Sequence, residues 1–444
     1  MVKGRKILYS FGSLAAAVSN QAFLTFILFF YVDVIKFPER HFMMAWGLFG
    51  LWNAVNDPLF GQWSDRTRTR WGRRVPFIAL GALPFAAFFY LLWVPPAGLP
   101  ERTLFWYLLG SMFLFDSFFT LVVLNWTALF PEMFPTLAER AEVSAWRQVL
   151  GIIGLVLGMA LPPLLFAGLG WRAMGGILAA VTLATIFLSL LGSKERPEAG
   201  AGAGVGLFRA LGYTFTSRSF MTFAAANFGM TLAMGTIQAT IAFFVKYILH
   251  ARQEMLSFLL GTTFLVTLLM LAFWRKITVK HGPRSAQIAA VVVFGLICLG
   301  FLFVSNLAGA FLVCGLLGIG LAGLMLIPDI LIADVVDEDE LRTGERREGM
   351  FFGINGLAIR LAGALQGVII TGVLILFRYD QKAVLQPASA LTGIRVLMSL
   401  VPLLALTLAA IALALYPLHG QRLARVKEDV NRKHLAAGTP APPA

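Results

Sequence analysis

Long apolar stretches separated by short polar connections recur throughout the 444-residue chain. Each stretch holds about 18 to 28 residues, and a helix of that length crosses roughly 30 Å of hydrocarbon. The pattern predicts an all-α polytopic membrane protein with twelve spanning helices, at residues 8–31, 42–62, 75–95, 104–128, 148–169, 172–192, 220–248, 256–273, 286–304, 308–333, 350–377 and 394–416.

Composition supports this fold class. The chain is 58% hydrophobic and 13% charged, with a mean hydropathy of +0.79, whereas soluble domains carry about 25% charged residues. Its two cysteines, Cys298 and Cys314, lie in apolar stretches and give no disulfide or metal-site signal. The five histidines fall outside the predicted spans, so no metal-ligand or nucleophile constellation lies within them. We therefore expect neither an enzyme, such as an acyl or glycosyl transferase, nor a cofactor.

The net charge of +13 is distributed unevenly among the loops. If the spans alternate, most lysines and arginines lie on the side that holds both termini, for example in the loops at 66–74 and 342–347. The positive-inside rule then places both termini in the cytoplasm of a multi-pass cell-membrane protein. Because topology explains the basic excess, we expect no nucleic acid as a partner. The expected partner is the lipid bilayer, and the protein is expected to be a monomer.

A connection rich in glycine and alanine, residues 193–219, divides the predicted spans into six and six. It predicts a flexible cytoplasmic linker between an N-terminal bundle (1–192) and a C-terminal bundle (220–418). Residues 419–444 are expected to form a cytoplasmic tail, partly helical and partly disordered. Six plus six spans are typical of major facilitator transporters, whose halves rock around a site at the membrane midplane.

One carboxylate stands out in the second predicted span. Asp57 is the only ionisable residue between Phe42 and Gly61, and a charge at membrane depth is costly unless it is paired, hydrated or bound to a cation. Asn53 lies four residues earlier and shares its helix face, Asn56 is adjacent, and Pro58 frees a backbone carbonyl. These oxygens predict a site for a small cation; the alternative is an aspartate that pairs with an arginine to fix two helices.

Three segments carry a family resemblance: Gly61–Arg74, Trp126–Arg147 and Ala333–Gly349. The first, GQWSDRTRTRWGRR, resembles the loop signature of major facilitator transporters and follows an Asn-Asp-Pro helix. Together the three are similar to the glycoside–pentoside–hexuronide cation symporter family, which includes the melibiose permease. The resemblance covers nearly the whole chain and implies the twelve-helix major facilitator fold.

The resemblance implies a cation site at Asn53, Asn56, Asp57 and Thr120. Asn53 stands where the family has a second aspartate, so the formal charge of the site falls to −1. A desolvated lone carboxylate favours its protonated form, whereas one Na⁺ would form a neutral pair with it. The coupling ion is therefore expected to be H⁺ or Na⁺, with no other metal.

A substrate site is also predicted, at Arg360, Arg147, Trp126 and Asp116; Arg360 and Arg147 match basic positions of the family, and Asp116 is an acid in the middle of a predicted span. Ala17 and Val123 occupy positions that carry sugar-binding carboxylates in the family. Arg360 lies about ten residues, roughly 15 Å, into its predicted span, and arginine suits carboxylate or phosphate. We therefore expect an anionic glycoside, uronide or other organic anion rather than a neutral sugar.

Each of these residues has a plainer interpretation. Arg147 could lie at the cytoplasmic side, and Arg360 could neutralise Asp57 or Asp116. Asp116 shares a helix face with Thr120, so it could instead extend the cation site or pair with an arginine.

Two charge clusters flank the predicted cytoplasmic ends of the spans. We expect interhelical ion pairs that close a cytoplasmic gate at Asp65, Arg66, Arg73, Arg74, Asp334, Asp337, Glu345 and Arg346. The function predicted overall is secondary active sugar transport by cation-coupled symport of a small organic solute. The alternatives are a lysophospholipid or amphiphile carrier or flippase, and a facilitator without cation coupling.

Overall fold

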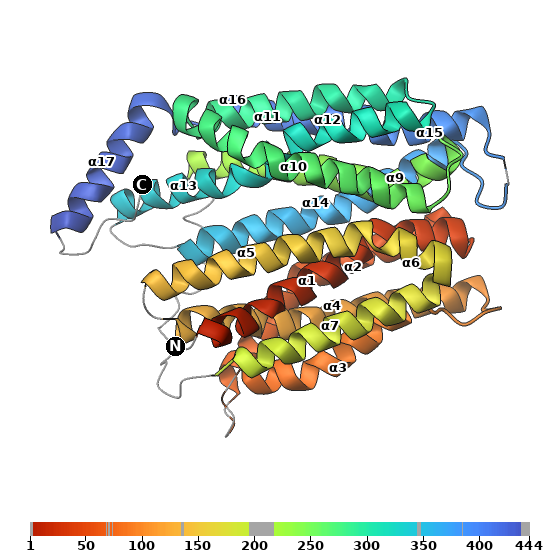
Figure 1. Cartoon of the computed structure of the whole chain (residues 1–444), viewed down its shortest axis with the longest axis horizontal. Coiled ribbons are helices and arrows are strands. Elements are labelled where there is room, and N and C mark those ends of the chain that lie inside the picture. The colour runs from red at the N-terminus through yellow and green to blue at the C-terminus, as the bar shows by residue number, and fades with distance from the viewer. Residues whose placement is uncertain are drawn as a thin grey trace. The chain divides into compact units, whose positions relative to one another are not determined.

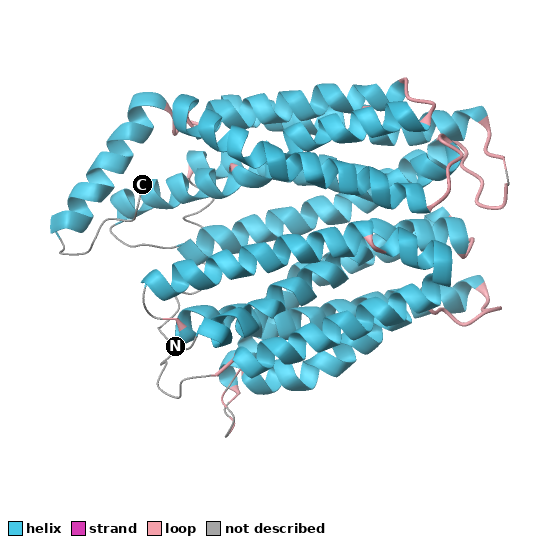
Figure 2. Ribbon diagram, in the orientation of Figure 1, coloured by secondary structure: helices cyan, strands magenta, loops and turns pink. Residues whose placement is uncertain are grey.

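The computed structural model describes residues 3–436 apart from 68, 70, 71, 73, 135, 136, 195–216, 344–347 and 384. Within these residues the chain is helical, with connections and one isolated bridge between Thr69 and Gly72 (Figures 1 and 2). The helices before residue 200 are α1 (Lys3–Leu28), the π-helical turn η1 (Phe29–Val34), α2 (Glu39–Arg66), α3 (Val75–Leu91), α4 (Glu101–Met133), α5 (Leu137–Ala160), α6 (Pro162–Leu169) and α7 (Trp171–Gly192).

The remaining helices begin at residue 218. They are α9 (Arg218–Tyr247), α10 (Glu254–His281), α11 (Pro283–Cys298), the 3-10 turn η2 (Leu299–Leu302), α12 (Leu307–Leu326), α13 (Pro328–Thr343), α14 (Glu348–Leu376), α15 (Ala388–Met398), α16 (Leu400–Ala414) and α17 (Gly420–Ala436). The last of these accounts for the predicted helical part of the tail, whereas residues 437–444 lie outside the description.

Each predicted span coincides with one helix or with two consecutive helices. Two of the breaks between consecutive helices have a local cause. Proline lacks an N–H and disfavours helical geometry in the residue before it, and Pro162 and Pro328 start α6 and α13. The span predicted at 148–169 therefore divides into α5 and α6, and the one at 308–333 divides into α12 and α13.

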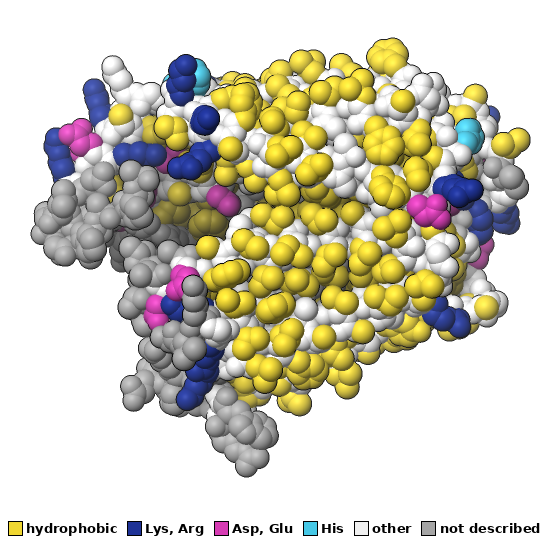
Figure 3. All heavy atoms as spheres, viewed as in Figure 1, with side chains coloured by type: hydrophobic (Ala, Val, Ile, Leu, Met, Phe, Trp, Pro, Cys, Tyr) yellow, Lys and Arg dark blue, Asp and Glu magenta, His cyan; other side chains and the backbone are white. Residues whose placement is uncertain are grey.

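Ten helical segments of the described chain are long and apolar enough to cross a membrane. α3 is an apolar helix of 17 residues, and α2 has 28 residues but lower hydropathy, because it carries Asn53, Asn56 and Asp57. The all-α membrane fold is confirmed, and twelve spans remain compatible with it. Hydrophobic side chains cover the flanks of the helices, and charged side chains gather toward helix ends (Figure 3).

Contacts divide the chain into two compact units. Unit 1 comprises Met1–Ala201, Gln238–Gly261 and Ala364–Ile394, and unit 2 comprises Gly202–Ile237, Thr262–Gly363 and Arg395–Ala444. Parts of α9 and α14 thus group with the first six predicted spans, so the units do not follow the predicted boundary at the linker. The organisation into two six-helix bundles stays a prediction.

In unit 1, α1 packs along α5 and α7, α3 packs on α4 and α7, and α2 packs on α4. Small residues permit the close approach of membrane helices. A Cβ atom on Gly154 of α5 would lie 2.8 Å from both the Ala17 Cβ atom and the Leu14 carbonyl oxygen of α1. Helix α1 thus approaches α5 at backbone distance.

In unit 2, α11 packs against α12 and α16, and α13 packs against α17. The hydroxyl of Tyr416 donates to the Leu331 carbonyl of α13 at 3.1 Å. Arg395 of α15 donates to three carbonyls at the end of the η2 segment, those of Phe301, Leu302 and Val304. These side chain to backbone bonds satisfy carbonyls that the helix ends leave unpaired.

Candidate cation site and the family of the chain

The strongest candidate site lies between α2 and α4. The side-chain amide of Asn53 donates to Oδ1 of Asp116 at 2.8 Å, and the amide of Asn56 donates to Oδ2 of the same carboxylate. Asn56 and Asp116 are buried, with exposed fractions of 0% and 4%. Both carboxylate oxygens of Asp116 are therefore held by amide groups of the neighbouring helix.

Helix periodicity brings these groups together. Asn53 and Asn56 lie three residues apart on one face of α2, and Asp116 and Thr120 lie four apart on one face of α4. Trp52 positions the two faces, because its indole N–H donates to the Ser117 hydroxyl at 3.2 Å and its ring stacks on Phe113. Thr120 is buried one helical turn after Asp116.

This group of side chains suits a small hard cation. A carboxylate, two amides and a hydroxyl offer oxygen ligands of the kind that such cations prefer, and the carboxylate alone can accept a proton. The amides now donate to Asp116, which supplies the hydrogen bonds that a buried carboxylate needs. Asp57 follows Asn56 in α2, but its side chain lies outside the description.

Two predicted substrate residues, Arg147 and Trp126, come together in unit 1. The Arg147 guanidinium lies 4.5 Å from the Trp126 ring centroid and 4.9 Å from that of Phe130. Trp126 is itself fixed, because its N–H donates to the Tyr9 carbonyl at 3.0 Å and the Tyr9 hydroxyl donates to the Trp126 carbonyl at 2.7 Å. Within the part of the chain that the structure describes, Arg147 forms no ion pair.

The other predicted residues are placed less completely. Arg360 lies in α14, within unit 2, and is partly exposed. Among the predicted gate residues, Arg73, Glu345 and Arg346 lie outside the described residues, as do the side chains of Asp65 and Arg66 of α2. Arg74 precedes α3, and Asp337 lies in α13.

Asp334 has a partner that the sequence pattern did not indicate. Its Oδ1 lies 3.2 Å from the Lys427 ammonium of α17. Two further acids of α13 also pair with α17: Glu338 lies 2.6 Å from Arg422, and Glu340 lies 3.1 Å from Lys433. The tail helix is therefore fastened to α13 by three ion pairs.

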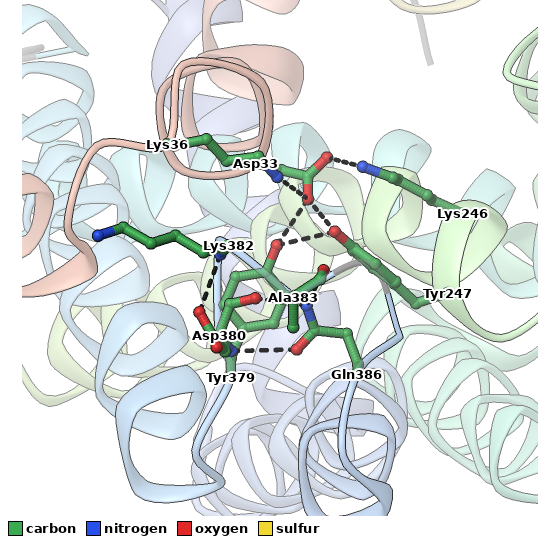
Figure 4. A network of polar contacts seen from close by, with 9 residues as sticks. All are labelled: Asp33, Lys36, Lys246, Tyr247, Tyr379, Asp380, Lys382, Ala383 and Gln386. Carbon is green, nitrogen blue, oxygen red and sulfur yellow. Dashed lines mark hydrogen bonds and ion pairs between the residues drawn. The ribbon is translucent and has the colours of Figure 1, made fainter.

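The sequence pattern also gave no indication of a buried network around Asp33 (Figure 4). Its carboxylate accepts from Lys246 at 2.5 Å, from Tyr379 at 2.6 Å and from Tyr247. Lys246 lies near the end of the seventh predicted span. The available signal was an aspartate at the end of the first apolar stretch, close after three aromatic residues.

Comparison with known proteins identifies the family. The isoprimeverose transporter of Lactiplantibacillus pentosus is 25% identical, over 96% of this chain and 91% of that protein. The sodium-dependent lysophosphatidylcholine symporter 1 of Gallus gallus is 22% identical, over 94% and 87%. A bacterial homologue of the human lysosomal transporter Spinster shares the fold, with a TM-score of 0.70, 14% identity and coverage of 97% and 99%.

The model of one transporter family matches most of the chain, residues 8–420. That family groups membrane transporters and not enzymes, in agreement with the apolar helices and with the resemblance of the loop motifs. The chain belongs to the MFS/sugar transport protein family of the major facilitator superfamily.

Proposed function

We propose that this protein is a cation-coupled symporter whose coupling ion binds between α2 and α4. The observation that carries the proposal is the buried carboxylate of Asp116, held by the amides of Asn53 and Asn56. An ionisable group at this depth is a functional site by default in a membrane transporter. Relatives named as symporters, one of them sodium-dependent, support the proposal.

Asp116 changes the charge of the proposed site. The resemblance alone leaves Asp57 as the single carboxylate, because asparagine occupies position 53. In the structure the carboxylate that accepts from Asn53 belongs to Asp116 of α4, whereas the family has its second carboxylate on the second helix. A proton would bind Asp116 directly, and Na⁺ would bind its carboxylate together with amide and hydroxyl oxygens of Asn53, Asn56 and Thr120.

The proposed substrate is an anionic glycoside, uronide or other small organic anion. The Arg147 guanidinium lies over the rings of Trp126 and Phe130, and a guanidinium held on an aromatic face can still donate from its edge to a carboxylate. Arg360 supplies a second cation in the eleventh predicted span. Ala17 and Val123 offer no hydrogen bond to sugar hydroxyls, and each unpaired hydroxyl costs about 1–3 kcal/mol.

The proposed topology follows the charge distribution. The protein lies in the cell membrane, with both termini on the cytoplasmic side. It acts as a monomer, and its two six-helix bundles give alternating access to the site.

Uptake into proteoliposomes tests the proposal. A panel of p-nitrophenyl glucuronide, p-nitrophenyl glucoside and lysophosphatidylcholine is offered under an inward Na⁺ gradient, an inward H⁺ gradient, or neither. We expect accumulation of the glucuronide under one of the two gradients, and that gradient identifies the coupling ion. Equal uptake with and without gradients would contradict symport, and a preference for the glucoside would contradict an anionic substrate.

A second candidate, transport of an amphiphile, is favoured by a groove in unit 2. The groove has a volume of about 460 Å³ and lies between α9, α14 and α16, lined by apolar side chains such as Phe228, Leu232, Leu357 and Leu408. Its size is within the range of ligand sites, and an acyl chain fits its chemistry. Cation-driven uptake of lysophosphatidylcholine, with no uptake of either glycoside, would select this candidate.

A further inference from the structure

Asp33 is the centre of a buried polar network at the end of the first spanning segment. It lies in the π-helical turn η1, and its side chain has an exposed fraction of 0%. Three groups donate to its two oxygens: the Lys246 ammonium at 2.5 Å, the Tyr379 hydroxyl at 2.6 Å and the Tyr247 hydroxyl (Figure 4). The Asp33 carboxylate therefore accepts hydrogen bonds from three side chains.

These donors come from segments far apart in the chain. Lys246 and Tyr247 end α9, and Tyr379 follows α14, so Asp33 joins the first predicted span to the seventh and the eleventh within unit 1. Burial and the negative charge of Asp33 raise the pKa of the Tyr379 hydroxyl, which keeps it protonated as a donor. A buried carboxylate that loses such partners is strongly destabilised.

The contact between α1 and α9 continues inward from Asp33. Phe243 packs edge-on against Phe29 with ring centroids 5.1 Å apart. Deeper still, the Gln238 amide donates to Gln21 and to the Thr25 hydroxyl, both at 2.7 Å. The step of eight positions from Thr25 to Asp33 corresponds to about 12 Å of helix. Asp33 thus lies at the end of a row of side-chain contacts between α9 and the α1–η1 segment, and we call this row the seam.

We propose that Asp33 is a latch that holds this seam shut on the outer side of the membrane. Entry of substrate from outside requires the first and seventh spans to separate, and this requires the Asp33–Lys246 ion pair to break. The inference rests on the alternating access and the topology proposed above, and not on coupling to a cation. The proposed gate clusters at 65–74 and 334–346 belong to the opposite, cytoplasmic side.

Lys36 provides a matched control beside the latch. Its ammonium lies 3.9 Å from Asp33, at the edge of an ion-pair distance, whereas that of Lys246 lies at 2.5 Å. The two lysine side chains are similarly exposed, at 40% and 37%, so the distance separates them: Lys36 makes no direct hydrogen bond to the carboxylate, and a long pair of this kind contributes little. Lys36 and Lys246 therefore lie near the same carboxylate. Because the Lys246 ion pair is the shorter one, the structure assigns the latch to Lys246.

A cysteine introduced by Thr25→Cys reports the opening of the seam. Thr25 is fully buried against Gln238, so the introduced thiol is labelled only when α1 and α9 separate. The full-length chain carries Cys298→Ala and Cys314→Ala to remove its native thiols. A membrane-impermeant maleimide is applied to right-side-out and to inside-out vesicles, with neither substrate nor an ion gradient.

We expect Asp33→Asn and Lys246→Met to raise the labelling rate of the introduced thiol in right-side-out vesicles about tenfold. Tyr379→Phe removes one donor and no charge, and we expect a rise of about two- to tenfold. Lys36→Met should leave the rate within about twofold of the parent protein. If Asp33→Asn does not yield a monodisperse protein, Lys246→Met and Tyr379→Phe decide the question.

Unchanged labelling in the folded variants would overturn the latch. An equal rise with Lys36→Met, or a rise confined to inside-out vesicles, would also overturn it. The readout needs no transported solute, so it is independent of the symport proposal. Faster labelling in a protein without cation-driven uptake would support the latch and refute symport, whereas cation-driven uptake with unchanged labelling would refute the latch alone.

Discussion

The side-chain amide of Asn53 in α2 donates a 2.8 Å hydrogen bond to the carboxylate of Asp116 in α4. The two residues are 63 positions apart, and the amide of Asn56 binds the second oxygen of the same carboxylate. Asp116, predicted from the sequence as a substrate residue, thus contacts two residues predicted to bind the cation. A substrate role for Asp116 stays a prediction, but the contact favours a cation role.

The first prediction concerns Arg147. Arg147→Gln keeps a polar side chain of moderate length but removes the charge that stacks on Trp126. Because a charge-assisted hydrogen bond contributes about 1.5–3 kcal/mol, we expect the KM for an anionic glycoside to rise at least about tenfold. Uptake of p-nitrophenyl glucuronide at a series of concentrations measures the effect.

Arg102→Gln is the control for this substitution, because Arg102 lies in the first turn of α4, where it is exposed. An unchanged KM in Arg147→Gln would show that Arg147 is an ordinary basic residue near the cytoplasmic side.

The second prediction concerns the packing of α1 on α5. Gly154→Ala places a methyl group 2.8 Å from the Leu14 carbonyl oxygen and the Ala17 Cβ atom, and overpacking of this kind costs about 1–3 kcal/mol. Gly151 lies one turn earlier on α5, and a Cβ atom there would be 3.9 Å from its nearest neighbour, Ser13. We expect a lower thermal unfolding midpoint for Gly154→Ala in detergent and no decrease for Gly151→Ala. Equal midpoints for the two variants would contradict the close approach of the helices.

The third prediction concerns the tail helix α17. Lys427→Ala leaves the buried carboxylate of Asp334 without its ion pair, so the docking of α17 on α13 should weaken. Hydrogen exchange of residues 420–436 should become at least about fivefold faster, because a lost charged partner costs on the order of 1 kcal/mol or more. Arg425→Ala is the matched control, since Arg425 is exposed and forms no ion pair within the described residues. Similar exchange in both variants would show that the ion pairs do not hold the tail.

The positions of the helices could be predicted because membrane thickness fixes the length of an apolar stretch. Pro162 and Pro328 are visible in the sequence, but each lies in a continuous apolar stretch. Such a stretch predicts one unbroken helix, so the two breaks are not predicted. Periodicity likewise placed Asn53 and Asn56 on one face and Asp116 and Thr120 on another.

Partners between helices were harder to predict. No local pattern indicates that Asp116 faces Asn53, or that Asp33 meets Lys246 over a separation of 213 residues. The same holds for Asp334 and Lys427, because the pairing depends on how α17 packs on α13. The sequence therefore indicates that acids such as Asp57 and Asp116 are unusual within apolar stretches, whereas tertiary packing decides which residues each charge contacts.

Moving the carboxylate between the two helices tests the cation site most directly. Uptake of the glucuronide into proteoliposomes is measured under the driving ion gradient and, separately, as exchange without a gradient. Asp116→Asn should lose gradient-driven accumulation and retain exchange, because exchange needs no net movement of the cation. The double variant Asn53→Asp with Asp116→Asn returns one carboxylate to the site from α2, and it should recover part of the accumulation. Asp429→Asn, at an exposed position of α17 outside the predicted spans, should behave as the parent protein. Full accumulation by Asp116→Asn would contradict the account.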